Sequence, residues 1–160
     1  MAEHFDPDEP LLDDLSALFG TVDPVPPDLA ATSLFAITVE QLRADMLELE
    51  HVETPELVAR SNDAGEREVV RTGTITFACE PVTVMINLSE SPTGGMCVDG
   101  WVAPAAPYRV ELYQPGSRIA VDSDDDGSFV LFDVPEGPTC LALCRTDGAG
   151  PTVCTPVIEL

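Results

Sequence analysis

The hydrophobic pattern changes its period near residue 64, and this change constrains the fold more than any other feature of the chain. Before that point apolar residues recur every three or four positions, as on one face of a helix. After it, apolar and polar residues alternate, which is typical of strands with one buried face. We therefore expect an acidic helical segment over residues 1–63, with a proline-rich linker at 23–27, and a β-sandwich domain over residues 64–160.

Three short helices are expected in the first part. The first starts at Asp8 or Glu9 and ends at Gly20, and the second covers about residues 28–37. The third begins at Thr38, where a threonine followed by glutamate and glutamine has the pattern of a capping box. Helices this short are marginal alone in water, so each of them needs a surface to pack on.

Apolar stripes on the first and third helices are the candidate partner-binding residues. For the third helix, the alternative is that its stripe packs on the protein's own sheet. For the first helix, which the linker separates from the rest, a groove on a partner and the chain's own domain are both open. The stripes consist of Leu11, Leu15, Leu18 and Phe19 in the first helix, and of Leu42, Met46 and Leu49 in the third.

The charge of the chain is strongly negative and restricts its chemistry. All seven basic residues are arginines, against 29 acidic residues, for a net charge of -22. Without lysine, Schiff-base enzymes and phosphate-loop nucleotidases are excluded, and the acidity excludes direct binding of DNA or RNA and repels anionic membranes. Residues 1–63 hold 15 of the acids and two of the arginines. We therefore expect the chain to bind a basic protein partner, and to bind neither nucleic acid nor a membrane.

Nine candidate strands with few helical signals between them favour an antiparallel β-sandwich. Turn signals containing Gly, Pro and Asp separate the strands at intervals of roughly ten residues. Trp101, the single tryptophan, is expected in the core or at a sheet edge rather than on a ligand-binding surface. The candidate strands are 67–71, 74–79, 82–88, 95–103, 107–113, 117–121, 128–133, 138–145 and 152–158.

One hairpin within this part has a recognisable pattern. An acidic turn that ends at Gly127 is followed by Phe129, the alternating Leu131, and the turn Val134-Pro135-Glu136-Gly137. Residues 122–143 resemble the hairpin of carboxypeptidase regulatory-like domains and of the related collagen-adhesin B-type and transthyretin-like sandwiches. The resemblance implies an antiparallel seven-stranded sandwich that is non-catalytic. Some adhesin domains form a Lys–Asn isopeptide cross-link, which a chain without lysine cannot form.

The chain as a whole resembles small actinobacterial proteins that carry such a β-domain behind a helical N-terminus. These proteins occur beside extracytoplasmic-function-type sigma factors and caspase-like peptidases, so the resemblance implies a regulatory role, with a sigma factor as a candidate partner. The zinc signature of anti-sigma domains is absent from the sequence. The matching segments are Leu11–Leu18, residues 23–27, Thr38–Leu49, Thr74–Leu88 and Val153–Val157.

Calcium is the one cofactor for which the sequence offers ligands. Asp122, Asp124, Asp126 and Asp133 stand at positions 1, 3, 5 and 12 of a loop with glycine at position 6, which is the spacing of a calcium-binding loop. The flanking segments are expected to be strands rather than helices, and aspartate is common in plain turns. A plain turn is therefore the alternative to a metal site.

The cysteines and histidines form no catalytic or zinc-binding pattern. An odd count of five cysteines favours reduced residues in the core, and Cys144–Cys154 is the one disulfide that a hairpin makes geometrically plausible. His4 and His51 lie far from any nucleophile motif, so we do not expect an enzyme. An acidic N-terminus and the lack of an apolar run of about 18 residues favour a cytoplasmic protein.

These features combine into one main expectation and two alternatives. The main expectation is a non-enzymatic, acidic interaction module that binds a basic protein through its N-terminal helices. The first alternative is a structural scaffold that self-associates, or docks on a larger enzyme, through the sandwich. The second is a calcium-binding sandwich. The oligomeric state is left open by the sequence.

Overall fold

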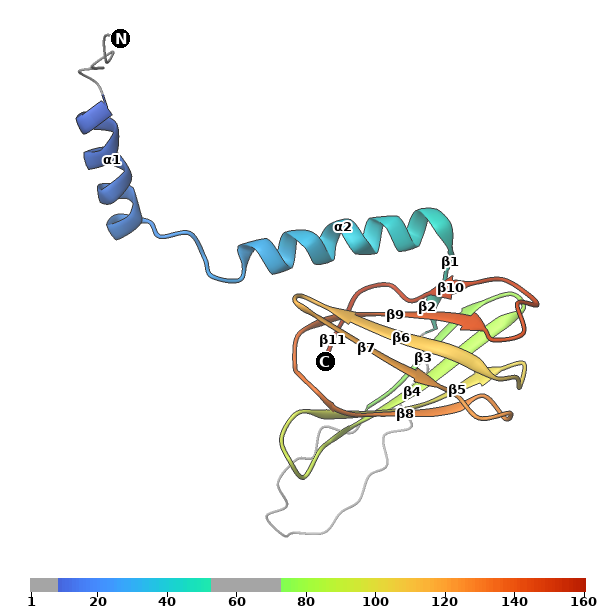
Figure 1. Cartoon of the computed structure of the whole chain (residues 1–160). Coiled ribbons are helices and arrows are strands. Elements are labelled where there is room, and N and C mark those ends of the chain that lie inside the picture. Colours follow the sequence, from blue (N-terminus) through green and yellow to red (C-terminus); the bar gives the residue numbers. More distant parts are fainter. Residues whose placement is uncertain (1–8, 53–72) are drawn as a thin grey trace.

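The computed structural model describes residues 9–52 and 73–160, in which two helices precede two β-sheets (Figure 1). The described chain is mainly β, as expected. Its helices are α1 (Glu9–Val22) and α2 (Leu29–Asp45). Its strands are β1 (Leu47–Glu48), β2 (Glu50–Val52), β3 (Gly73–Cys79), β4 (Val82–Glu90), β5 (Met96–Ala103), β6 (Tyr108–Gln114), β7 (Ser117–Asp122), β8 (Ser128–Val134), β9 (Pro138–Arg145), β10 (Val153–Cys154) and β11 (Ile158–Glu159).

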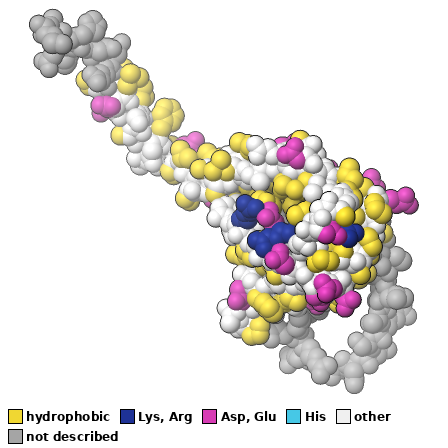
Figure 2. Space-filling view, turned by 45° about the vertical axis from the view of Figure 1, so that its right-hand side comes forward, with side chains coloured by type: hydrophobic (Ala, Val, Ile, Leu, Met, Phe, Trp, Pro, Cys, Tyr) yellow, Lys and Arg dark blue, Asp and Glu magenta, His cyan; other side chains and the backbone are white. Residues whose placement is uncertain are grey.

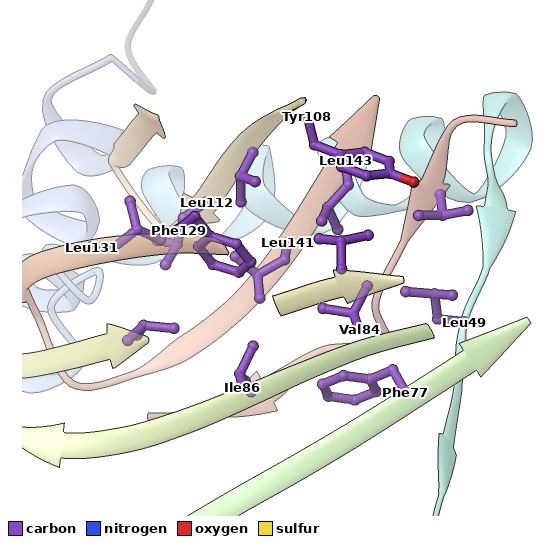
Figure 3. Packing of buried hydrophobic residues seen from close by; sticks show 14 of the residues in the cluster. Leu49, Phe77, Val84, Ile86, Tyr108, Leu112, Phe129, Leu131, Leu141 and Leu143 are labelled. Atoms are coloured by element: carbon purple, nitrogen blue, oxygen red, sulfur yellow. The ribbon is translucent and has the colours of Figure 1, made fainter. Parts of the chain in front are cut away.

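The two sheets face each other and share one core. The larger sheet has the order β1-β10-β9-β6-β7, with β11 also paired to β9, and the smaller has the order β2-β3-β4-β5-β8. Phe77 and Ile86 of the five-stranded sheet lie in the same buried cluster as Tyr108, Leu112 and Leu141 of the six-stranded sheet (Figure 3). Burial of these apolar side chains between the sheets is the main stabilising contribution.

The long strands follow the alternation in the sequence. In β4, for example, Val82, Val84, Ile86 and Leu88 are buried and the residues between them are not. The expected last strand instead appears as two short strands, β10 and β11, and the candidate strand 67–71 lies outside the described residues. Because β1 pairs with β10 in parallel, the six-stranded sheet is mixed, and the described chain holds more strands than the antiparallel seven expected.

A single helix, α2, replaces the expected second and third helices. Thr38 does not cap a new helix, because its hydroxyl donates to the carbonyl oxygen of Leu34 at 2.9 Å, the bond that threonine makes inside a helix. The backbone becomes extended only at Met46, whose N–H still donates to the carbonyl oxygen of Leu42. The prediction of a break at Ile37 was therefore wrong.

Helix α2 lies on the outer face of the six-stranded sheet (Figure 1). Its buried residues Phe35, Val39 and Leu42 are spaced as on one helix face. They form a second apolar cluster with residues of β9 and β10, with half-buried Met46 and Tyr113 against it. The sheet residues of this cluster are Cys140, Ala142 and Cys154.

The chain then crosses from one sheet to the other within six residues. Strand β1 pairs with β10 of the six-stranded sheet, and β2 pairs with β3 of the five-stranded sheet. Leu49 lies between them, is 1% exposed, and donates its N–H to the carbonyl oxygen of Cys154 at 2.7 Å. The sheets thus include residues that precede the expected boundary at residue 63. Leu49 was predicted on the third helix, but it lies between two strands.

Candidate interaction surface

Helix α1 presents its apolar residues to solvent. It stands away from the sandwich, beyond the proline-rich segment 23–27 (Figure 1). The stripe predicted from the sequence is present, and it continues past Gly20 to Val22, which extends the helix by half a turn. We call this set the α1 stripe, and its residues are between 42% and 73% exposed: Leu11, Leu12, Leu15, Leu18, Phe19 and Val22.

Carboxylates lie on α1 and just beyond its C-terminal end, without a compensating cation on α1. Asp13 and Asp14 are exposed on α1, and Asp23 and Asp28 follow in the linker and at the start of α2. The one arginine of the two helices, Arg43, is held by Glu40 at 3.0 Å and Glu48 at 3.1 Å. The exposed apolar surface of α1 therefore lies in a negative field, which attracts positively charged partners.

Helix α2 also has an exposed apolar side, which the sequence prediction did not identify. Ala30, Ile37 and Ala44 are exposed and lie on the side of α2 that is turned away from the sheet, with exposed Leu34 beside them. Figure 2 shows yellow apolar side chains along this helical part of the surface. A helix that is apolar on opposite sides is normally covered on both of them. The seven-residue spacing of Ala30, Ile37 and Ala44 was the available signal.

Three of the predicted partner-binding residues are instead used inside the protein. Leu42 is buried in the cluster below α2, Met46 is half-buried against it, and Leu49 is in the main core. Their side chains are not available to a partner while α2 is docked. The prediction is corrected to the alternative already considered for this segment, in which the stripe packs on the protein's own sheet.

A groove of about 780 Å³ opens between α2 and the β6–β7 hairpin. Its wall contains Tyr113, whose hydroxyl donates to Glu111 at 2.5 Å; burial, together with this bond, raises the pKa of Tyr113 to about 12. Arg118 stacks on the Tyr113 ring and pairs with Glu111 at 2.7 Å. The groove has a mixed polar and apolar lining, and its arginine is already paired with a carboxylate. Its lining residues are Ala31, Leu34, Phe35, Thr38, Gln41, Leu42, Asp45, Met46, Tyr113, Gln114, Gly116, Ser117 and Arg118.

The four aspartates of the calcium-like spacing are not brought together. Asp122 pairs with Arg109 at 2.9 Å, and the Asp124 carboxylate accepts the N–H groups of Asp126 and Ser128 in a tight turn. Asp133 lies five residues further along β8, roughly 17 Å at the spacing of an extended strand. Within residues 9–52 and 73–160, no three metal-ligating acids, cysteines or histidines gather in one place.

Asp133 has its own hydrogen-bond partners in the loop between β4 and β5. Its carboxylate accepts the hydroxyls of Ser91, at 2.7 Å, and Thr93. The bond from Ser91 is the largest cause that lowers the pKa of Asp133. Asp133 also has a φ of +54°, so these bonds hold a residue in a backbone conformation that few residues other than glycine adopt. Its role in the structure is to fix this loop against the end of β8.

All five cysteines are free thiols in the structure. The Cys144–Cys154 disulfide does not form, because the residue opposite Cys154 on β9 is Ala142. Cys140 and Cys154 are buried under α2, and burial raises the pKa of Cys140 to about 11 and also raises that of Cys154. These two cysteines are parts of the core below α2, as the composition led us to expect.

In native protein at pH 8, we expect a disulfide reagent to modify Cys79, Cys97 and Cys144 first, because they are half-exposed. Cys140 and Cys154 are expected to react at least tenfold more slowly, since the thiolate is the reactive form and both their burial and their raised pKa suppress it. Mass spectrometry of peptides after timed labelling measures the order. Equal rates for all five in native protein would contradict the packing of α2 on β9 and β10.

Comparisons with protein-family models, with curated proteins and with solved structures give no match to this chain. Within the described residues, neither helix has the combination of length and apolar composition that crossing a bilayer requires. The functional argument therefore depends on the geometry of the chain's own surfaces.

Proposed function

We propose that this chain is a non-enzymatic, acidic protein-interaction module that binds a basic protein partner through α1. The observation that carries the proposal is the α1 stripe, six large apolar side chains that contact nothing in the protein that would bury them. Burying one leucine or phenylalanine side chain contributes about 1.5–3 kcal/mol, so a partner groove that covers several of them supplies most of the free energy of binding.

The charge distribution supports a basic partner over a neutral one. The carboxylates that border the α1 stripe steer a positively charged surface toward it, and this attraction acts before the apolar side chains are buried. A single helix of 14 residues is also marginal on its own, so docking on a partner stabilises the helix as well as the contact. Binding is therefore expected to weaken as salt is added.

The family resemblance leads us to propose a regulatory protein of the cytoplasm, with a sigma factor as the first partner to test. The seven long strands β3–β9, each of six residues or more, support a sandwich of the carboxypeptidase regulatory-like and transthyretin-like kind. So does the turn at Gly127, followed by buried Phe129 and Leu131. Five free thiols are in keeping with a reducing compartment.

A scaffold that self-associates through the sandwich is the second candidate, because β7 is the end strand of its sheet. Ion pairs of Arg109 with Asp122 and of Arg118 with Glu111 lie along this edge, and charged residues on an edge strand oppose pairing with another strand. Light scattering separates the two functions, since a stable homo-oligomer held by β7 favours the scaffold.

To test the proposed function, Leu15→Glu and Leu18→Glu are combined in the tagged full-length chain, and the proteins that co-purify are identified by mass spectrometry. Both side chains are exposed, so the fold is expected to be unchanged, while two charges in the α1 stripe prevent its burial. We expect the variant to recover the partner at less than a tenth of the wild-type amount.

The matched control places the same two charges elsewhere on α1. Ser16 and Ala17 lie off the α1 stripe, so Ser16→Glu with Ala17→Glu adds equal charge to the same helix. This control is expected to keep the partner. The proposal is wrong if the Leu15/Leu18 variant recovers as much partner as wild type. It is also wrong if both variants lose the partner equally, since added charge alone would then explain the loss.

A further inference from the structure

The outer faces of the two sheets differ in what covers them. Helix α2 lies on the six-stranded sheet, whereas neither described helix lies on the outer face of the five-stranded sheet (Figure 1). Antiparallel sheets tolerate such an open face when its side chains are polar. On this sheet several of them are large and apolar.

One row of side chains crosses the open face from strand to strand. Val52 of β2 is opposite Thr76, Thr76 is opposite Met85, and Met85 is opposite Trp101 of β5. Residues that pair in this way project on the same side of a sheet. Val52 is 42%, Met85 41% and Trp101 47% exposed, with half-buried Thr76 between Val52 and Met85, so the row is a largely apolar surface across the strands rather than a core layer. Trp101 was predicted in the core or at a sheet edge. It lies instead on the exposed face of β5, which is an interior strand.

Two apolar residues of β8 lie further along the same outer face, beyond Ser128, which is the residue opposite Trp101. Val130 pairs with Asp99, on the outer face beside Trp101, and is half-buried. Phe132, 69% exposed, follows buried Leu131 at the register shift between β5 and β8, and lies four residues, roughly 13 Å along the strand, from the residue opposite Trp101. Val52, Met85, Trp101, Val130 and Phe132 are here called the sheet-face patch. Clusters of exposed large apolar residues on a monomer mark interaction sites.

The charges that the described residues place around the sheet-face patch are negative. Glu50 and Asp99 lie on the same outer face, and β2, β3, β4, β5 and β8 contain no arginine. The arginines of the described residues are on α2, β6, β7 and β9, and each one is already paired with a carboxylate. Figure 2 shows dark-blue arginines beside magenta carboxylates on the molecular surface. Among residues 9–52 and 73–160, the charges that border the patch are therefore negative, and the described strands of its sheet carry no arginine to neutralise them.

We propose that the sheet-face patch is a second docking surface, for a protein partner that presents an apolar centre bordered by arginine or lysine side chains. The apolar centre covers Met85 and Trp101, and a partner cation reaches Asp99 or the face of the Trp101 ring, which attracts cations. A net charge of -22 opposes a second copy of this chain as the occupant. The patch and α2 lie on opposite outer faces, so this surface is independent of the α1 stripe.

Trp101 is the only tryptophan of the chain and reports directly on the patch. The probe is a short peptide of alternating arginine and leucine, added to the full-length protein while tryptophan emission is recorded. We expect the emission to shift to shorter wavelength, and quenching by acrylamide to fall, as the peptide covers the ring. A peptide with glutamate in place of arginine, and one with serine in place of leucine, are each expected to bind at least tenfold more weakly.

Variants that keep the tryptophan locate the binding site. Met85→Ser and Phe132→Ser are made separately, and because both side chains are exposed, each variant is expected to fold like wild type. Each is expected to raise the apparent Kd of the arginine–leucine peptide at least tenfold. The Leu15→Glu/Leu18→Glu variant is the control and is expected to bind like wild type.

Three outcomes overturn the proposal. The first is an unchanged tryptophan spectrum at saturating peptide, and the second is equal binding of the glutamate peptide. The third is a dimer, seen by light scattering, that Met85→Ser dissociates, because a second copy would then occupy the patch. Failure of this test leaves the function of α1 unaffected, since the α1 variant is scored separately on partner recovery.

Discussion

Replacing Gly127 with alanine is expected to lower the free energy of unfolding by about 3–5 kcal/mol. Gly127 has a φ of +82°, and a Cβ there would lie 2.5 Å from the carbonyl oxygen of Val102. This oxygen belongs to the backbone of β5, which is paired on both sides and cannot move without disturbing the sheet. The N–H of Val102 also donates to the carbonyl oxygen of Gly127 at 3.0 Å, so the two backbones are held together.

Gly94→Ala is the matched control for this prediction. Gly94 has a similar φ of +90°, but a Cβ there meets no atom within 4 Å. It therefore has the backbone strain without the collision, and we expect a loss of about 1–2 kcal/mol. Denaturant unfolding measures both variants. Equal losses would contradict the role assigned to the contact with Val102, and a wild-type stability for Gly127→Ala would mean that this turn differs from the structure.

Replacing Leu49 with alanine is expected to lower the free energy of unfolding by about 2–5 kcal/mol. Its side chain is 1% exposed and fills the space between the two sheets where the chain crosses from β1 to β2. The surrounding backbone is fixed by hydrogen bonds to the segment around Cys154, so the site cannot collapse to fill the cavity. Denaturant unfolding gives the loss directly.

Leu47→Ala is the control, two residues earlier and of the same chemistry. Leu47 is 48% exposed on β1, so its truncation is expected to change the free energy of unfolding by less than about 0.5 kcal/mol. If Leu49 were on the exposed stripe of a helix, as the sequence predicted, both substitutions would have small effects. Equal small effects would therefore favour that prediction over the crossing segment.

The strands from β3 to β9 could be predicted within one or two residues because most of them are long enough to show an alternation, and because turn residues bound β9, whose residues 139–143 are all buried. In β4, for example, the pattern repeats over four buried positions. Most of the turns that connect consecutive strands contain glycine or proline. Phe129 and Leu131 of β8 were placed on one face for the same reason, and both are buried. Local pattern and tertiary burial agree in this part of the chain.

The segment from Ile37 to Val52 could not be predicted in the same way. Strands β1 and β2 are two and three residues long, too short to have a period, and they form only because β10 and β3 are there to pair with. Thr38 matched a helix start by composition, while its surroundings on the sheet favoured a continuous helix. A pattern within about 15 residues does not contain these long-range partners.

The two interaction surfaces also differ in whether the sequence could predict them. The α1 stripe was predictable, because it depends on the spacing of residues within one helix. The sheet-face patch was not, because the sequence shows that Trp101 and Val102 point to opposite sides but not which side the second sheet covers. The pairing of β4 with β5 brings Met85 opposite Trp101, and the pairing of β5 with β8 places Val130 opposite Asp99 on the same face.

The pairing of β1 with β10 has a consequence for how the protein is made. Leu47 leaves the ribosome 106 residues before its partner Val153, and Leu49 is separated almost as far from the carbonyl of Cys154. Until that segment is synthesised, β1 has no strand to pair with, and the cluster below α2 lacks one of its members. Contacts so distant in sequence form late and slowly. The nascent chain therefore emerges with α1 and the α2 face that later packs on the sheet both uncovered, and any chaperone or partner that recognises apolar helices meets them before the sandwich closes.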